Sequence, residues 1–294
     1  MAALRRRSKG YVLALGGGGA RGLAHIGVLK VLQREGVPIS AIAGTSMGAV
    51  VGAMFAYYED AIEVEEIFRK FLQSSFHEKY ARTFFLLSED PNALKEPEKT
   101  ATRIGRRFLY LKAASMHAVF SHNILDEAFR ELMPDVRFTD LRLPFSCVAA
   151  DLRTGAEVVM SEGRVIPAVV ASSSIPGFVE PANVARHILV DGSTVSTVPV
   201  EAARGMARGK KTIAVDVSVE LKRTEKLETA FEIAMRSGEI TGHYLTEWQL
   251  SGADFVIHPE VGRTTWSNFD KLDEMIRAGE IAAGRTIPLL RKLN

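Results

Sequence analysis

The chain has 294 residues, of which 47% are hydrophobic and 24% charged, and its formal net charge is only +2 at pH 7. Such a composition predicts a globular protein with one substantial core, and the small charge argues against a dedicated nucleic-acid binder, which usually carries a strong basic excess. The single cysteine, Cys147, lies in the apolar run 144–150. It excludes a disulfide framework or a cysteine zinc site, and we expect a buried core thiol.

The N-terminus imitates a signal peptide, with basic residues at 5–9 followed by apolar residues at 11–15. The apolar run stops at four glycines after five residues, which is too short for a secretory segment. We therefore interpret residues 1–10 as a basic tail. The longest uncharged stretch, 41–58, is interrupted by Gly-Thr-Ser-Met-Gly and favours a strand, a turn and a helix over a membrane span. We expect a cytoplasmic protein that contacts a membrane only peripherally, at the inner surface.

Two β-turn-α units follow the tail. The first is a strand at 11–15, a glycine turn and a helix at 23–32 that Gly36 ends. The second is a strand at 41–43, the serine-containing turn and a helix at 49–58. Two such units in succession predict a parallel sheet covered by helices.

Residues 59–120 change character, because they have helical periodicity without strands, which predicts a helical cap or lid inserted in the sheet domain. Between positions 69 and 112 there are ten Lys and Arg against five Asp and Glu, interleaved with aromatic residues. One interpretation is a solvated helical face with its aromatics turned to the core. The other is a surface that meets anionic lipid, or that pairs with a second copy as a homodimer.

The rest of the chain alternates strands and helices. The pattern predicts helices at 124–133, 167–173, from 199, at 229–250 and at the C-terminus, and strands at 145–150, 157–160, 187–190, 212–216 and 254–257. The predicted class is α/β, with residues 11–294 as a single domain.

The turn Gly44-Thr-Ser46-Met-Gly48 matches the nucleophile-elbow pattern G-x-S-x-G. A serine exposed on a sharp strand-to-helix turn needs small residues two positions to either side, because the backbone is crowded there. The flanking strand and helix are the expected context, although a serine in a structural turn would produce the same pentapeptide.

The glycine run Gly16 to Gly19, followed by Arg21 and Gly22, also lies between a strand and a helix. It contains G-x-G-x-x-G, but the acidic residue that would bind a ribose is missing, since no Asp or Glu occurs between Glu35 and Glu59. The alternative is an oxyanion site, in which backbone N–H groups of Gly18 and Gly19 at a helix N-terminus hold a negative oxygen. The neighbouring elbow favours this second interpretation.

A serine nucleophile requires a base. Asp191 follows the strand at 187–190, on a turn with Gly192, where an Asx-turn residue is the simpler explanation. Of seven histidines, only His258 follows a strand as a triad histidine would, so Ser46, Asp191 and His258 are one candidate triad. The early position of the elbow, in the second β-α unit, argues against that arrangement.

Three segments together, Gly-Gly-Gly-Ala-Arg-Gly at 17–22, Gly-Thr-Ser-Met-Gly at 44–48 and Asp-Gly at 191–192, resemble the bacterial patatin-like phospholipases related to neuropathy target esterase. The segments at 171–178 and 199–205 also look like that family's blocks. The likeness covers roughly residues 11–220, and it is weak over 60–120 and beyond 220.

The resemblance implies a three-layer α/β/α fold, a Ser-Asp dyad without histidine, and hydrolysis of phospholipid or lysophospholipid esters without metal or other cofactor. Ser46 would be the nucleophile and Asp191 the base, with oxyanion donors at Gly17, Gly18 and Gly19. Arg21 would orient the glycine loop or face the substrate phosphate. Ser193 departs from the family's usual Gly or Ala, and its hydroxyl would either lower the basicity of Asp191 or point away. A protein that binds a nucleotide or acyl group without hydrolysis is the competing class.

Overall fold

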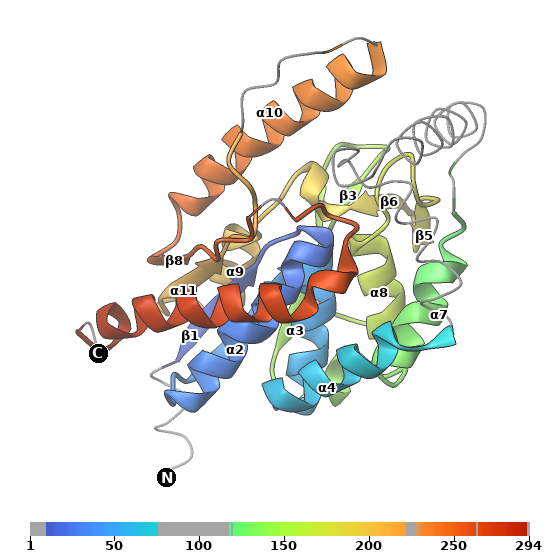
Figure 1. Cartoon of the computed structure of the whole chain (residues 1–294). Coiled ribbons are helices and arrows are strands. Elements are labelled where there is room, and N and C mark those ends of the chain that lie inside the picture. The colour runs from blue at the N-terminus through green and yellow to red at the C-terminus, as the bar shows by residue number, and fades with distance from the viewer. Residues whose placement is uncertain are drawn as a thin grey trace.

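The computed structural model describes residues 10–75, 118, 120–221, 227, 230–262 and 264–292 (Figure 1). Its strands are β1 (Tyr11–Leu15), β2 (Ile39–Thr45), β3 (Phe145–Asp151), β4 (Glu157–Met160), β5 (Ala182–Val184), β6 (His187–Asp191), β7 (Thr212–Val215) and β8 (Phe255–Ile257). Its α-helices are α2 (Ala24–Arg34), α3 (Met47–Tyr58), α4 (Ala61–Leu72), α7 (Asn123–Leu132), α8 (Val165–Ser172), α9 (Val200–Met206), α10 (Ala230–Leu250) and α11 (Leu272–Lys292).

The strands form one sheet in the order β5-β6-β3-β2-β1-β7-β8, with β4 also paired to β3. Strands β3, β2, β1, β7 and β8 are parallel to one another, whereas β4, β5 and β6 join by antiparallel pairing. The prediction of a mostly parallel central sheet is therefore confirmed. The β1 strand lies inside the sheet, between β2 and β7.

Helices cover both faces of the sheet, which is why the central strand β1 is buried along its whole length. Side chains alternate between the two faces of a strand. Leu13 and Leu15 join the large core with α2, α3 and α11, whereas Val12 and Ala14 join a smaller core with α9. Figure 1 shows α2, α3 and α11 together on one side of the sheet. The predicted three layers are thus present.

The predicted elements agree with the structure except at some boundaries. The second strand extends from the predicted 41–43 to Ile39–Thr45, and the three-residue β5 was not predicted because it is too short to show a pattern. The buried thiol of Cys147, whose pKa burial raises, confirms the core prediction. None of the described helices is long and apolar enough to cross a membrane.

The predicted insertion 59–120 begins inside the main core. Helix α4 starts at the cap residue Asp60, whose carboxylate accepts hydrogen bonds from two backbone N–H groups, and it buries Val64 and Phe68 in the large core. Residues 76–117 and 119, as well as the tail at 1–9, lie outside the described residues. The predicted cap over 59–120 therefore stays a prediction.

Helices α2 and α11 pack against each other at two glycines. A Cβ atom at Gly279 would lie 2.0 Å from the carbonyl oxygen of Ala24, and one at Gly27 would lie 1.9 Å from that of Ile276. These contacts are with backbone, which no side-chain rotation relieves. The α11 helix, which follows the last strand, is thereby held against the first helix of the fold.

This contact generates a stability prediction. Gly279→Ala forces the two helices apart and should destabilise the protein by about 1–3 kcal/mol, the usual cost of overpacking. Gly284→Ala on the same helix meets nothing within 4 Å, and it should stabilise by about 0.5–1 kcal/mol because Gly is a poor helix former. Thermal unfolding of both variants beside the wild type tests the pair. Equal effects of the two substitutions would contradict the close packing.

Candidate active site

Ser46 occupies the single residue between β2 and α3, with φ 52° and ψ −123°. A non-glycine residue in such a conformation costs about 1–3 kcal/mol and persists only where its surroundings hold it. Here the carbonyl oxygen accepts hydrogen bonds from Ala49 N–H at 2.8 Å and from Val50 N–H at 3.1 Å. The Ser46 N–H donates to the hydroxyl oxygen of Ser172 at 3.1 Å. The strained turn is thus fixed from both sides.

The two glycines of the elbow are required by contacts with backbone. A Cβ atom at Gly48 would lie 2.1 Å from the carbonyl oxygen of Leu15, and one at Gly44 would lie 2.5 Å from the carbonyl oxygen of Gly48. The sharp turn from β2 into α3 is therefore possible only because positions 44 and 48 carry no side chain. This geometry is what the G-x-S-x-G pattern predicts.

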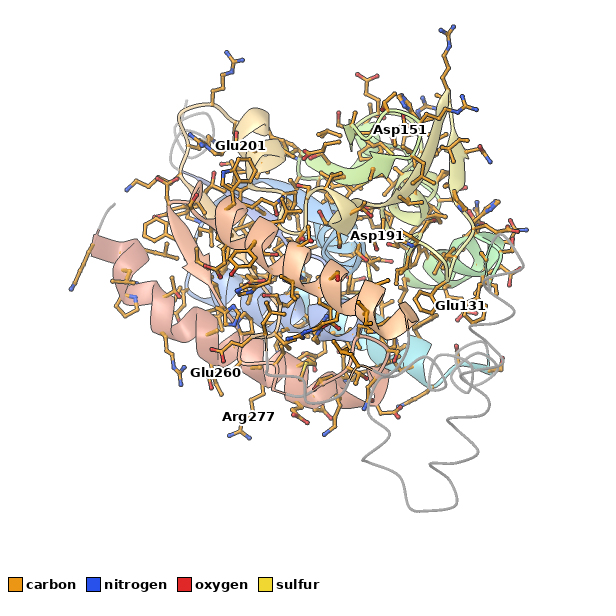
Figure 2. The ribbon with its side chains drawn as sticks, turned by 90° about the horizontal axis from the view of Figure 1, so that it is seen from above. Glu131, Asp151, Asp191, Glu201, Glu260 and Arg277 are labelled. Carbon is orange, nitrogen blue, oxygen red and sulfur yellow. The ribbon has the colours of Figure 1, made fainter. Side chains whose placement is uncertain are left out.

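Asp191 ends β6 and is 4% exposed. In the sheet Asp191 lies opposite Ala149 of β3, and the adjacent Val148 lies opposite Thr45 of β2, so the carboxylate and the serine turn are at the same level. A Cβ atom at Gly192 would lie 2.3 Å from the carbonyl oxygen of Val148, which explains the glycine that follows the aspartate. Figure 2 shows Asp191 well inside the outline of the molecule, whereas Asp151 of the same sheet lies near its rim.

The carboxylate of Asp191 is subject to two opposing influences. Burial raises its pKa most strongly, because the ionised form loses hydration. The nearby Ser46 hydroxyl and the backbone N–H and hydroxyl of Ser193 lower the pKa again, and the Ser193 N–H donates a hydrogen bond to Oδ1 at 2.8 Å. The strand register brings the serine turn and Asp191 to the same level of the sheet. Of the two expectations for the Ser193 hydroxyl, its lowering effect on the pKa of Asp191 favours the one in which it makes Asp191 less basic.

The glycine run lies beside this pair. A Cβ atom at Gly17 would be 2.4 Å from Oγ of Ser193 and 3.4 Å from Cβ of Ser46. The Gly17 N–H donates to the carbonyl oxygen of Thr197 at 2.9 Å, so it is occupied. The N–H groups of Gly18 and Gly19 have no acceptor among the described residues. Of the three predicted oxyanion donors, Gly17 has its N–H bonded to another backbone group, whereas Gly18 and Gly19 keep theirs available among the described residues.

Two side chains support the glycine loop from behind. Nε of Arg21 donates to the carbonyl oxygen of Gly18 at 3.1 Å, within the glycine loop that it was predicted either to orient or to complement at the substrate phosphate. Nε2 of His25 lies 2.8 Å from the carbonyl oxygen of Gly16. Burial lowers the pKa of His25 to about 4, so the ring is neutral at pH 7 and Nε2–H donates. Sequence reasoning missed His25, which it considered only as a triad member.

His258 does not join Ser46 and Asp191. Its Nδ1 lies 3.0 Å from Oδ2 of Asp216, and this contact raises the pKa of the histidine while it lowers that of the aspartate. His258 follows β8, and β7 and β1 lie between that strand and β2. The triad alternative is therefore not supported by the arrangement of these residues.

Two serines at the C-terminal end of α8 bind the backbones of Ser46 and Asp191. Sequence reasoning did not assign these serines a role. Ser172, the last residue of α8, accepts from Ser46 N–H and donates to the carbonyl oxygen of Val148 at 2.6 Å. The carbonyl oxygen of Ser174 accepts from Asp191 N–H at 2.9 Å. The segment Ala171-Ser-Ser-Ser174 contributes to the site through these contacts, which no periodicity in the sequence could indicate.

An apolar pocket opens at Ser46 and extends between α3, α4 and α7. The space inside it, including its open mouth, is about 830 Å³. Apart from the glycine Gly19, the serines Ser46 and Ser173 and the indole N–H of Trp266, its lining side chains are aliphatic, thioether or phenyl groups. The lining residues besides the glycine and the two serines are Met47, Val50, Phe68, Phe71, Ile124, Leu125, Ala128, Phe129, Leu132, Ile175, Trp266 and Phe269.

Comparison with known proteins adds a family match. The family model "Patatin-like phospholipase" matches residues 13–204. Patatin-like phospholipase domain-containing protein 6 of Homo sapiens is 30% identical over 207 residues, covering 70% of this chain and 13% of that protein. An NTE family protein of Mycobacterium tuberculosis is 34% identical over 220 residues, covering 74% of this chain and 52% of that protein. The chain thus spans about half, or much less, of the length of these relatives.

Among solved structures, the fold is similar to that of VipD from Legionella pneumophila, with a TM-score of 0.51 and 16% sequence identity. The match covers 97% of this chain and 67% of VipD. At this identity the likeness concerns the fold alone.

The buried carboxylate generates a second prediction. Because burial raises the pKa of Asp191 above its unfolded value of about 3.9, the folded state loses stability as the pH rises from the unfolded to the folded pKa, and it stays less stable above that range. Asp191→Asn removes this cost and should raise the melting temperature at pH 7–8. The gain should shrink as the pH falls below about 4, the unfolded pKa, because wild-type Asp191 then becomes protonated in both states. A melting temperature lowered at pH 8 would contradict the prediction.

Proposed function

Because the chain belongs to the patatin-like phospholipase family, we propose that it hydrolyses acyl esters of phospholipids or lysophospholipids with Ser46 as nucleophile and Asp191 as base. The observation that carries the proposal is the position of Ser46, on a strained turn at an apolar pocket and close enough to the buried Asp191 carboxylate to lower its pKa. A nucleophile within reach of its base is the minimal arrangement for covalent ester hydrolysis.

In the proposed cycle, the Asp191 carboxylate takes the proton of the Ser46 hydroxyl as Oγ attacks the ester carbonyl carbon. The N–H groups of Gly18 and Gly19 then donate to the oxygen that becomes negative. The intermediate collapses to an acyl-enzyme, and water releases the acid in a second attack. A carboxylate is a weak base for a hydroxyl, and the raised pKa of Asp191 supports the assignment because it makes proton transfer less unfavourable.

The pocket supports a lipid substrate. Its walls are almost entirely aliphatic and aromatic, and acyl chains are transferred favourably from water to such surroundings at about 0.8 kcal/mol per buried CH₂. Ser46 lies among the lining residues, so an acyl chain in the pocket would present its ester to the hydroxyl. Contact of residues 59–120 with a membrane surface, and a homodimer, remain further predictions.

The dyad is tested by labelling and turnover. A fluorophosphonate should form one adduct, on Ser46, detectable by peptide mass spectrometry, and Ser46→Ala should lose both the adduct and ester hydrolysis. Asp191→Asn should reduce kcat/KM by ~100- to 10,000-fold, the usual contribution of a general base.

His258→Gln provides the control, since the dyad predicts activity within a few-fold of the wild type and the triad predicts a loss like that of Asp191→Asn. An unlabelled wild-type chain that nevertheless binds acyl ligands or nucleotides saturably would favour the non-hydrolytic class.

Ser193 gives a prediction about pH. Its hydroxyl lowers the pKa of Asp191, so Ser193→Ala should raise that pKa. Since Asp191 acts as a base only when ionised, the acidic limb of the kcat/KM profile should move to higher pH in the variant, and the plateau rate should be equal or higher. The profiles are measured on one short-chain ester from pH 4 to 9. An unmoved limb would mean that Asp191 does not control it.

A further inference from the structure

Three consecutive serines lie at the C-terminal end of α8, beginning with its last residue, Ser172. The first and the third of them have structural partners. Ser172 binds the backbone N–H of Ser46, and Ser174 binds the backbone N–H of Asp191 through its carbonyl oxygen while its hydroxyl donates to Val170. The middle residue, Ser173, differs from both. Its side chain is 9% exposed, its hydroxyl oxygen has no hydrogen-bond partner, and it lines the apolar pocket together with Ser46.

An unpartnered buried hydroxyl is unfavourable in the free protein. A buried polar group without a hydrogen bond generally destabilises a fold, and most such groups in native proteins have partners. Alanine in place of Ser173 would avoid the cost, because the site is otherwise surrounded by apolar side chains. The hydroxyl is therefore explained best by a partner that enters the pocket with the substrate.

The position of Ser173 indicates which part of the substrate it meets. Along the sheet, β1 lies on one side of β2 and β3 lies on the other. The glycine loop follows β1, whereas Ser172 is bound to β3 and Ser174 to the end of β6. Ser173 and the glycine loop thus flank Ser46 from opposite sides. When the carbonyl oxygen of the substrate ester points to the N–H groups of Gly18 and Gly19, the alcohol part of the ester lies on the opposite flank of Ser46. That flank is formed by Asp191 and Ser173.

Resting on the proposed function, we propose that the Ser173 hydroxyl binds the alcohol oxygen of the scissile ester and stabilises it as it leaves. When the tetrahedral intermediate collapses, the bond between the carbonyl carbon and the alkoxy oxygen breaks, and its electron pair goes to that oxygen. The proton that Asp191 took from Ser46 passes to the same oxygen, which releases a neutral alcohol. Ser173 keeps its own proton and donates only a hydrogen bond, which is strongest while the oxygen is most negative.

The hydrogen bond matters most for a poor leaving group. An alkoxide such as that of a glycerol carries nearly full charge on oxygen, whereas p-nitrophenolate spreads its charge over the ring and needs little help. Losing a hydrogen bond to a charged group corresponds to ~10- to 100-fold in rate. Ser173 would therefore favour natural alkyl esters over activated aryl esters.

The test compares two esters of the same acyl chain, one with glycerol and one with p-nitrophenol. Ser173→Ala should lower kcat/KM for the glycerol ester by ~10- to 100-fold, and change that for the p-nitrophenyl ester by less than about 3-fold. Ser173→Thr, which keeps the hydroxyl, should restore most of the difference. Ser161→Ala removes an exposed hydroxyl outside the pocket and should change neither value.

The outcomes separate the two proposals. No change with Ser173→Ala, or equal losses with both esters, would overturn the role of Ser173 while leaving the dyad intact. A wild-type chain that hydrolyses neither ester and takes up no fluorophosphonate would refute the proposed function instead. Thermal unfolding gives an independent readout, because Ser173→Ala should leave the melting temperature equal or higher, and a clear decrease would mark the hydroxyl as structural and count against the proposal.

Discussion

The rest of the site depends on the conformation of one residue, Ser46, which turns the chain from β2 into α3 with a positive φ. An L-residue does not keep that conformation by itself, so its neighbours must impose it. Backbone atoms of α3 fill the space that a side chain at Gly44 would need, backbone atoms of β1 fill that of Gly48, and Ser172 binds the Ser46 N–H. The sheet and its covering helices therefore stabilise a local strain, and the serine hydroxyl is presented at the pocket as a result.

The second constraint is the burial of the Asp191 carboxylate, which disfavours its ionised form. Full burial would leave Asp191 largely protonated and useless as a base, whereas full hydration would leave it too weakly basic. The Ser193 N–H donates to the carboxylate, and the nearby hydroxyls of Ser46 and Ser193 also lower its pKa, so these groups oppose the effect of burial. Where the family usually has Gly or Ala, the extra hydroxyl of Ser193 shifts this balance toward the ionised form. The same arrangement that suits a base also makes the folded state less stable than it would be without the charge.

Much of the fold and part of the site could be predicted from the sequence. The parallel sheet follows from strand and helix periodicities, and Ser46 and Asp191 follow from motifs whose glycines are dictated by local crowding. The remainder depends on contacts between distant residues. Nothing local distinguishes His25, which binds Gly16, from His258, which binds Asp216, because both histidines lie beside apolar residues. The role of Ser172 likewise arises only when α8 packs beside the serine turn. Backbone pairing also occupies the N–H of Gly17, which the motif alone counts as a donor.

The walls of the pocket have a consequence for how such a protein can diversify. The candidate reacting groups come from strand ends and turns of the sheet, whereas α4 and α7 supply many of the apolar side chains that line the pocket. Side chains such as Phe68 and Phe129 form no hydrogen bonds with the strained turn at Ser46. Their sizes determine how deep the pocket is for a bound chain. Chemistry and chain selection are thus encoded in separate stretches of the polypeptide. Under the proposed function, selection could exchange one acyl preference for another through a few substitutions in two helices, while Ser46, Asp191 and the glycine loop were inherited without change.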